Sequence, residues 1–137
     1  MTRPTGLTKD AGYEIGVSRT LPVPPEAVWD YLTGPEGQAA WLGEGPAVEL
    51  RRGARYTLAD GTAGEVRGCR PGVRLRLTHR PPEGGESTVQ FTIQARGSRS
   101  VLQFHQERLA DARERERQRH HWRAVMERVT DALTPAA

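Results

Sequence analysis

The sequence predicts an α+β fold in which a curved antiparallel sheet packs against one long C-terminal helix. The sheet is predicted from residues 47–108, where apolar and polar residues alternate between turn signals. The helix is predicted from apolar residues that recur at i, i+3, i+4, i+7 and i+11, namely Trp122, Val125, Met126, Val129 and Leu133. At about 100° per residue this spacing gathers them into one stripe. That stripe needs an apolar surface, which the sheet supplies.

Length and composition favour one domain, because 137 residues with 36% hydrophobic content can bury a core without metals or disulfides. We expect a flexible leader over 1–12 and a single domain over 13–134. The one cysteine, Cys69, excludes an intrachain disulfide and a CxxC motif. No signal peptide or long apolar run is evident, so we expect a cytoplasmic protein with no membrane association.

The formal net charge is +3 and the pI is near 9.6, values that raise the question of nucleic-acid binding. All basic residues except Lys9 are arginine, and acidic residues are interleaved with them along the chain. No basic stripe results from this arrangement. We therefore expect no specific nucleic-acid partner.

The first elements are delimited by prolines and glycines. Residues 13–21 alternate between apolar and polar side chains, which predicts a half-buried strand. Pro25 suits the first turn of a helix, where a missing N–H costs nothing, and Gly34 ends that helix. Pro35 can then open a second short helix that runs to Leu42.

A run of strands follows, joined by short turns. Asp60-Gly61, Pro71-Gly72 and Gly97-Ser98 mark tight connections, because glycine readily takes the positive φ that such turns require. Short hairpins imply an antiparallel meander, so with the first strand we expect six to seven strands. The predicted strands are 48–51, 55–58, 62–70, 73–79, 88–95 and 100–108.

The long helix begins at a capping-box pattern, Asp111 with Glu114 three residues on, and ends at Thr134. Traced backwards from Trp122, its inward stripe passes through Gln118 and Arg115 and so becomes polar. One interpretation is that this half of the helix covers a cavity that tolerates charge. The other is that it projects into water as a run of alternating charge.

The sequence assigns no catalytic residue, metal ligand or cofactor. His120 and His121 are adjacent on a helix and point about 100° apart, so they are not the i, i+4 pair that grips zinc. Cys69 is interpreted as a half-buried strand residue, and no serine lies in a Gly-x-Ser-x-Gly elbow. Any acid–base chemistry would fall to residues near a cavity mouth: Arg115, Tyr56, His121 or Glu65.

Short motifs spread over about 13–134 carry a family resemblance. They are Pro-Pro-Glu-Ala-Val-Trp at 24–29, Thr-Gly-Pro-Glu at 33–36, Trp-Leu-Gly at 41–43, Arg-Gly-Ala-Arg-Tyr at 52–56, Asp60-Gly61, Gly-Glu-Val at 64–66, the His105 strand and Trp-Arg-Ala-Val at 122–125. In this order they resemble the START-like or SRPBCC superfamily with its helix-grip (Bet v-like) fold. Within it, they are similar to the family of the activator of heat shock protein 90 ATPase.

The resemblance implies a cavity between the long helix and the sheet, which in many relatives holds a lipid, polyketide or aromatic metabolite. Strand parity and the helix stripe suggest its walls, although each of these side chains could instead fill the core. Such a cavity would have a volume of roughly 300–1,000 Å³. The proposed lining residues are Trp41, Tyr56, Val66, Leu75, Phe91, Ile93, Phe104, Arg115, Gln118, Trp122 and Met126.

Three functions remain open at this point. The first is binding of an apolar small molecule without covalent chemistry. The second is an adaptor that acts on a chaperone through its surface, and the third is a polyketide cyclase or aromatase that uses Arg115 and Tyr56. The family often has Gly-Gly at Gly53-Ala54 and a glycine at His121, so its ligand preference does not transfer. Both a monomer and a homodimer are compatible with the sequence.

Overall fold

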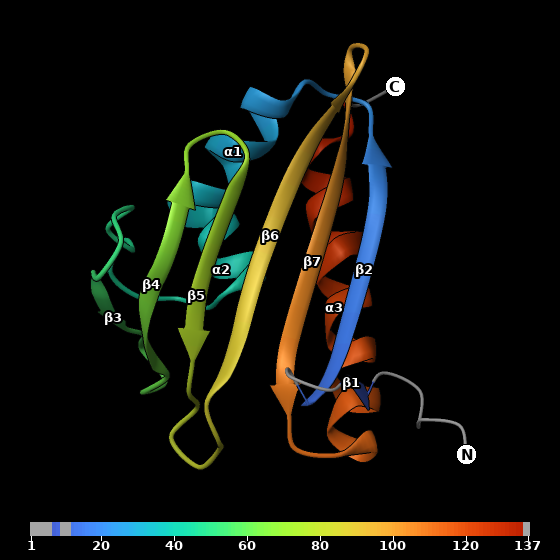
Figure 1. Cartoon of the computed structure of the whole chain (residues 1–137). Helices are drawn as coiled ribbons and strands as arrows, with labels where there is room; N and C mark the ends of the chain where they lie inside the picture. The colour runs from blue at the N-terminus through green and yellow to red at the C-terminus, as the bar shows by residue number, and fades with distance from the viewer. Residues whose placement is uncertain (1–6, 9–11, 136–137) are drawn as a thin grey trace.

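The computed structural model describes residues 7–8 and 12–135 and shows one antiparallel sheet with all three helices on one face (Figure 1). The seven strands lie in the order β1-β2-β7-β6-β5-β4-β3, so the first long strand pairs with the last. The strands are β1 (Leu7–Thr8), β2 (Gly12–Leu21), β3 (Arg55–Thr57), β4 (Ala63–Arg70), β5 (Arg74–His79), β6 (Ser87–Arg96) and β7 (Arg99–Leu109). The helices are α1 (Pro25–Thr33), α2 (Pro35–Trp41) and α3 (Ala112–Leu133). The predicted helix-grip fold is confirmed.

Alternation along the strands separates an inner face from an outer face. In β7 the side chains of Leu102, Phe104 and Gln106 are buried, whereas those of Gln103 and its odd-numbered neighbours are exposed or half-buried. The three predicted hairpin turns are also present, and the φ angles of Gly61, Gly72 and Gly97 are 92°, 78° and 62°. The sheet therefore presents one apolar face to the helices, as the sequence pattern predicts.

Helix α3 lies over β2 and β7 and begins at a side-chain cap (Figure 1). The carboxylate of Asp111 accepts a hydrogen bond of 2.8 Å from the backbone N–H of Glu114. Of the predicted stripe, Leu133 is half-buried and the other four members are buried: Trp122, Val125, Met126 and Val129. The C-terminal half of the helix thus closes the core.

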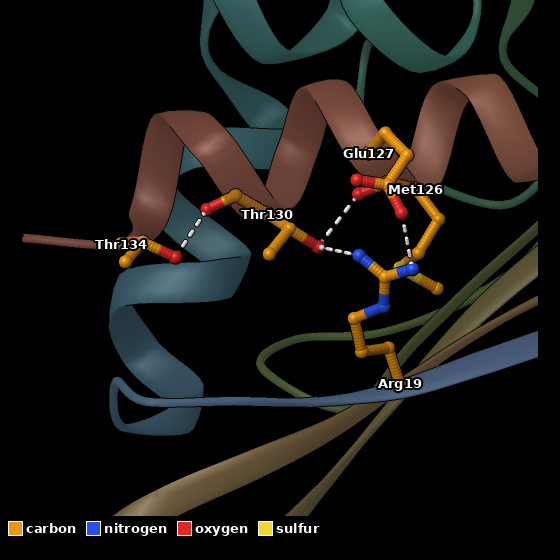
Figure 2. A network of polar contacts seen from close by, with 5 residues as sticks. All are labelled: Arg19, Met126, Glu127, Thr130 and Thr134. Carbon is orange, nitrogen blue, oxygen red and sulfur yellow. Dashed lines mark hydrogen bonds and ion pairs between the residues drawn. The ribbon is translucent and has the colours of Figure 1, made fainter.

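A polar network fixes that half of α3 to β2 (Figure 2). The guanidinium of Arg19 on β2 donates to Thr130 Oγ1 at 3.1 Å and forms an ion pair with Glu127. The hydroxyl of Thr130 in turn donates to the carbonyl of Met126, and that of Thr134 donates to the carbonyl of Thr130. The contact with Glu127 raises the pKa of Arg19, and the same contact lowers the pKa of Glu127.

The prediction of a strand over 48–51 was wrong. The backbone there is irregular, and it is tied to α2 instead of to a neighbouring strand. The buried side chain of Gln38 accepts a hydrogen bond from the N–H of Val48 and donates to the carbonyl of Pro46, both at 3.0 Å. This amide therefore takes the backbone groups that a sheet would have used.

The predicted leader over 1–12 lies largely outside the described residues. Leu7–Thr8, which the structure describes, pair antiparallel with Gly12 and Tyr13 as the short strand β1. No described helix combines the length and apolar character needed to cross a bilayer.

Candidate functional site

A cavity of about 280 Å³ lies between the first half of α3 and the inner face of the sheet. A second space of about 200 Å³ adjoins it on the side of the β7–α3 connection and shares His79, Pro81, Gln106 and Gln118 with it. The cavity is lined by Trp41, Leu42, Asp60, Thr62, His79, Pro81, Val89, Gln106, Gln118, His121 and Trp122. Its position matches the point where the inward stripe of α3 changes from apolar to polar.

Two indole rings form rigid walls of the cavity. The indole N–H of Trp41 donates to the carbonyl of Leu32 at 2.9 Å, and that of Trp122 donates to Gln106 Oε1 at 2.8 Å. Phe104 stacks on the Trp122 ring with centroids 5.0 Å apart and on the Trp41 ring at 6.3 Å. Both tryptophans are buried and have their polar atoms paired, so each wall keeps its shape without a ligand.

Gln106 is the polar centre of the cavity, and only 4% of its surface is exposed. Its Oε1 accepts from Trp122, and its Nε2 donates to the hydroxyl of Ser87 at 2.9 Å. Gln106 was not among the lining residues predicted from the sequence. A signal was present, because Gln106 shares the strand parity of Leu102 and Phe104 and must therefore point inward.

Two histidines face the same cavity from different elements. His79 ends β5 and has the inward parity of Leu75 and Leu77, while His121 lies on α3 beside Trp122. Burial lowers the pKa of His79, and the nearby His121 lowers it further, whereas Asp60 acts in the opposite direction. Burial also lowers the pKa of His121. Both imidazoles are therefore neutral at pH 7.

Three larger hollows lie on charged surfaces, one of about 360 Å³ beside Arg55 and Glu65 and two of about 510 Å³ each. Of the two largest, one runs between β2 and α3, where Arg123 and Glu127 are exposed, and the other lies on the outer face of the sheet beside Arg67, Arg76 and Arg108. An apolar molecule in either hollow would keep much of its surface in water. The cavity beneath α3 is the better small-molecule site because five of its lining residues are buried and two of these are tryptophans: Trp41, Thr62, Val89, Gln106 and Trp122.

One group of three residues in the described part of the chain could supply metal ligands. Glu14, His105 and Glu107 place ligand atoms within 4.8 Å of one another, on the neighbouring strands β2 and β7. The guanidinium of Arg76 already forms an ion pair with Glu107 and supplies the positive charge that a cation would bring. His120 instead lies near Glu116 on the surface of α3. We assign no metal site to either group.

The family model for activator of Hsp90 ATPase homolog 1-like protein matches residues 22–134. The chain belongs to this family. No curated protein matches the chain.

Solved structures resemble this family member in fold. CalU16 from Micromonospora echinospora has a TM-score of 0.77 at 19% identity, over 90% of this chain and 76% of its own. The Aha1 dimer from Colwellia psychrerythraea has a TM-score of 0.70 at 16% identity, over 88% and 95%. DynU16, from the dynemicin biosynthetic locus, has a TM-score of 0.73 at 21% identity over 88% of this chain. The chain spans about half of DynU16, 46% of its length.

The structure of this family member divides the predicted lining residues into three groups, the first at the cavity, the second in the core and the third, Tyr56 and Arg115, elsewhere. Trp41, Gln118 and Trp122 meet at the cavity. The remaining apolar residues of the prediction pack together in the core and do not line the cavity, because the space under the C-terminal half of α3 is filled. These core residues are Val66, Leu75, Phe91, Ile93, Phe104 and Met126.

The two residues expected to serve a cyclase in this family member, Tyr56 and Arg115, lie away from the cavity. The hydroxyl of Tyr56 donates to the carbonyl of Thr78 at 2.6 Å, and burial raises the pKa of this phenol. The guanidinium of Arg115 donates to the carbonyl of Glu14 at 2.8 Å and so links α3 to β2. Both groups are occupied in holding the fold together. Near neutral pH the groups at the cavity that can exchange a proton are instead the two histidines, because hydrogen bonds from Thr62 lower the pKa of Asp60.

Proposed function

We propose that this protein binds a small, mainly apolar molecule in the cavity beneath α3. The observation that carries the proposal is a partly open space of about 280 Å³ between α3 and the sheet, with two buried indole walls. A buried apolar cavity of about 150 Å³ is large enough to bind benzene. The volume here therefore suits one substituted ring, and it falls just below the range expected from the sequence. Long lipids fit this space poorly unless they extend into the adjoining one.

The contacts of the walls support binding without rearrangement. Trp41 and Trp122 are held by hydrogen bonds to Leu32 and Gln106, so a ligand need not order them. Gln106 already has partners for both its oxygen and its nitrogen, which leaves apolar contact as the main source of affinity. Such a site has the usual form of a small-molecule pocket, with apolar walls and few polar groups.

The test is a titration of the purified protein with toluene and indole, followed by calorimetry and by the thermal midpoint Tm. At a ligand concentration of about 100 Kd, binding should stabilise the protein by about 2.7 kcal/mol and raise Tm. Val89→Phe, which fills the cavity, should abolish binding, because Val89 is one of its buried walls. Val101→Phe on the outer face is the matched control and should bind as the wild type does.

Native mass spectrometry of protein purified from its own host provides an independent test. A bound metabolite would appear as added mass that is absent from the Val89→Phe variant. If neither probe binds and no added mass appears, the small-molecule proposal is refuted.

The family supplies a second candidate, an adaptor that binds an Hsp90-type chaperone. In the described part of the surface the exposed large apolar residues are Leu50 and Val73, with 39% and 37% of their surface accessible. They do not form an extended apolar patch, so recognition of a chaperone would depend on the abundant surface arginines. Stimulation of a chaperone ATPase at low salt, lost at high salt, would support this function. The same stimulation by Val89→Phe would separate it from ligand binding.

A further inference from the structure

His79 has a feature that the fold does not explain. Its Nδ1 is buried and finds no hydrogen-bond partner within the described part of the chain. Buried polar side-chain atoms in native proteins are nearly always paired. His79 also lines both the cavity and the adjoining space, so its imidazole lies at the junction of the two. Nδ1 has less than 1 Å² of accessible surface, so a ligand oxygen reaches it by rotation of the imidazole or by a shift of a neighbouring wall side chain.

The groups around His79 determine what kind of ligand atom it can take. Asp60 faces it from the turn before β4 and His121 faces it from α3. The adjoining space adds charged groups from β7 and from the start of α3, which are Arg108, Asp111, Glu114 and Arg117. Of these, Glu114 and Arg117 form an ion pair. With a lowered pKa the free imidazole is neutral at pH 7, so one of its nitrogens is a hydrogen-bond acceptor.

The apolar part of the cavity determines the rest of the ligand. Trp41 and Trp122 supply two aromatic walls, and Val89 and Leu42 supply aliphatic contact. The volume of about 280 Å³ is nearly twice that of a cavity that holds benzene. One ring with a short substituent fills such a space.

We propose that the ligand is a single-ring aromatic compound with an acidic oxygen, a phenol or a carboxyl group, and that His79 Nδ1 binds that oxygen. This inference rests on the proposed function, because it requires that the cavity hold a small molecule. A neutral phenol donates its O–H to the imidazole. A carboxylate binds as His79 takes up one proton from solvent, which gives an imidazolium–carboxylate pair.

The experiment is calorimetric titration with three probes of similar size: phenol, benzoate and anisole, which has the ring and oxygen but no O–H. We expect the wild type to bind phenol or benzoate about ten- to hundredfold more tightly than anisole, as for one buried hydrogen bond to a charged or acidic group. His79→Phe should remove this preference, so that phenol, benzoate and anisole bind with affinities within about tenfold of one another. His120→Phe, on the exposed surface of α3 and outside the cavity, is the matched control and should keep the preference.

The pH dependence distinguishes the two acidic groups. Over about pH 5 to 8 benzoate stays ionised, so uptake of a proton by His79 makes its affinity fall as pH rises, by up to about tenfold per unit. Phenol stays neutral in this range, and its affinity should be nearly constant. His79→Asn keeps a hydrogen-bonding group that does not titrate, so it should retain binding of phenol and lose the pH dependence of benzoate. This variant also serves if His79→Phe does not fold.

The outcomes separate the two proposals. Equal affinity of the wild type for all three probes, or a preference that survives His79→Phe, would overturn the role of His79 while leaving the cavity as a binding site. The same holds if benzoate keeps its pH dependence in His79→Asn. Failure of all three probes to bind would instead refute the proposed function itself.

Discussion

Replacing Gln106 with methionine would test whether this amide holds the cavity wall in place. Methionine has a similar length but neither accepts nor donates as the amide does. The change removes the acceptor of the Trp122 indole N–H and the donor to Ser87 Oγ, both of which are buried contacts. Ser87 keeps a longer contact of 3.4 Å to the carbonyl of His79. The indole N–H is therefore the group left without a partner.

The expected loss follows from that unpaired group. A buried donor without an acceptor costs about 1–3 kcal/mol, part of which the more apolar methionine offsets. For a domain of this size, each kcal/mol lowers Tm by about 2–6 °C. A double-mutant cycle with Trp122→Phe separates the two effects. The gain from the more apolar methionine is the same whether residue 122 is Trp or Phe, so it cancels when the two costs of Gln106→Met are subtracted. Gln106→Met should cost about 1–2 kcal/mol less in Trp122→Phe, which has no N–H to leave unpaired.

The assay is urea unfolding of the four proteins, followed by circular dichroism. The free energies of unfolding give the coupling between Gln106 and Trp122 directly. Additivity of the two single changes within about 0.5 kcal/mol would refute the argument, since it would show that the hydrogen bond contributes nothing to stability.

Three further predictions concern the cap, the sheet and the histidines. Asp111→Ala should lower the free energy of unfolding by about 1 kcal/mol, because the Glu114 N–H loses its acceptor, and an unchanged urea midpoint would contradict this. Gly64→Ala should destabilise the protein by at least about 1–3 kcal/mol in a thermal scan, because the added Cβ would lie 2.0 Å from the carbonyl oxygen of Thr78. A Cβ at Gly68 meets nothing within 4 Å, so Gly68→Ala is the control and should be nearly neutral in that scan. The pKa of His79 is lowered in the folded state, so below about pH 6.5 the unfolded chain binds more protons than the folded chain. The free energy of unfolding should therefore decrease as the pH falls from about 6.5 to the pKa of His79 in the folded protein. Tm should therefore drop as the pH falls through and below about 6.5, and a drop of equal size in His79→Asn would show that another group is responsible.

Periodicity predicted most of the fold because the inner face of each long element is continuous. In β7 the apolar alternation through Phe104 specifies one buried face, and in α3 the apolar stripe from Trp122 specifies another. The structure buries both of these faces. The failure over 48–51 has a different origin. Gln38, which is distant in sequence, binds the backbone of this segment, and no local pattern contains that contact.

The candidate site was less predictable, because parity tells which way a side chain points and not what it meets. Phe91 and Trp41 both face inward, yet Phe91 is enclosed by neighbouring rings and only Trp41 reaches the cavity. Arg115 shows the same limit, since its guanidinium turns aside to the carbonyl of Glu14. Gln106 lies two residues after Phe104, and His79 lies two residues after Leu77. Continuing the alternation of each strand by two residues would therefore have predicted that both side chains point inward.

The pairing of β2 with β7 has a consequence for biosynthesis. Leu21 pairs with Ser100, and Tyr13 pairs with Leu109. The first long strand to leave the ribosome therefore lacks its neighbour until β7 has been synthesised. The helix that covers this strand is translated later still. Pairing between such distant segments makes folding slow and leaves apolar strand surface uncovered in the meantime. A nascent chain stalled before Arg99 should therefore remain sensitive to protease and bind holdase chaperones, whereas the released chain should resist digestion.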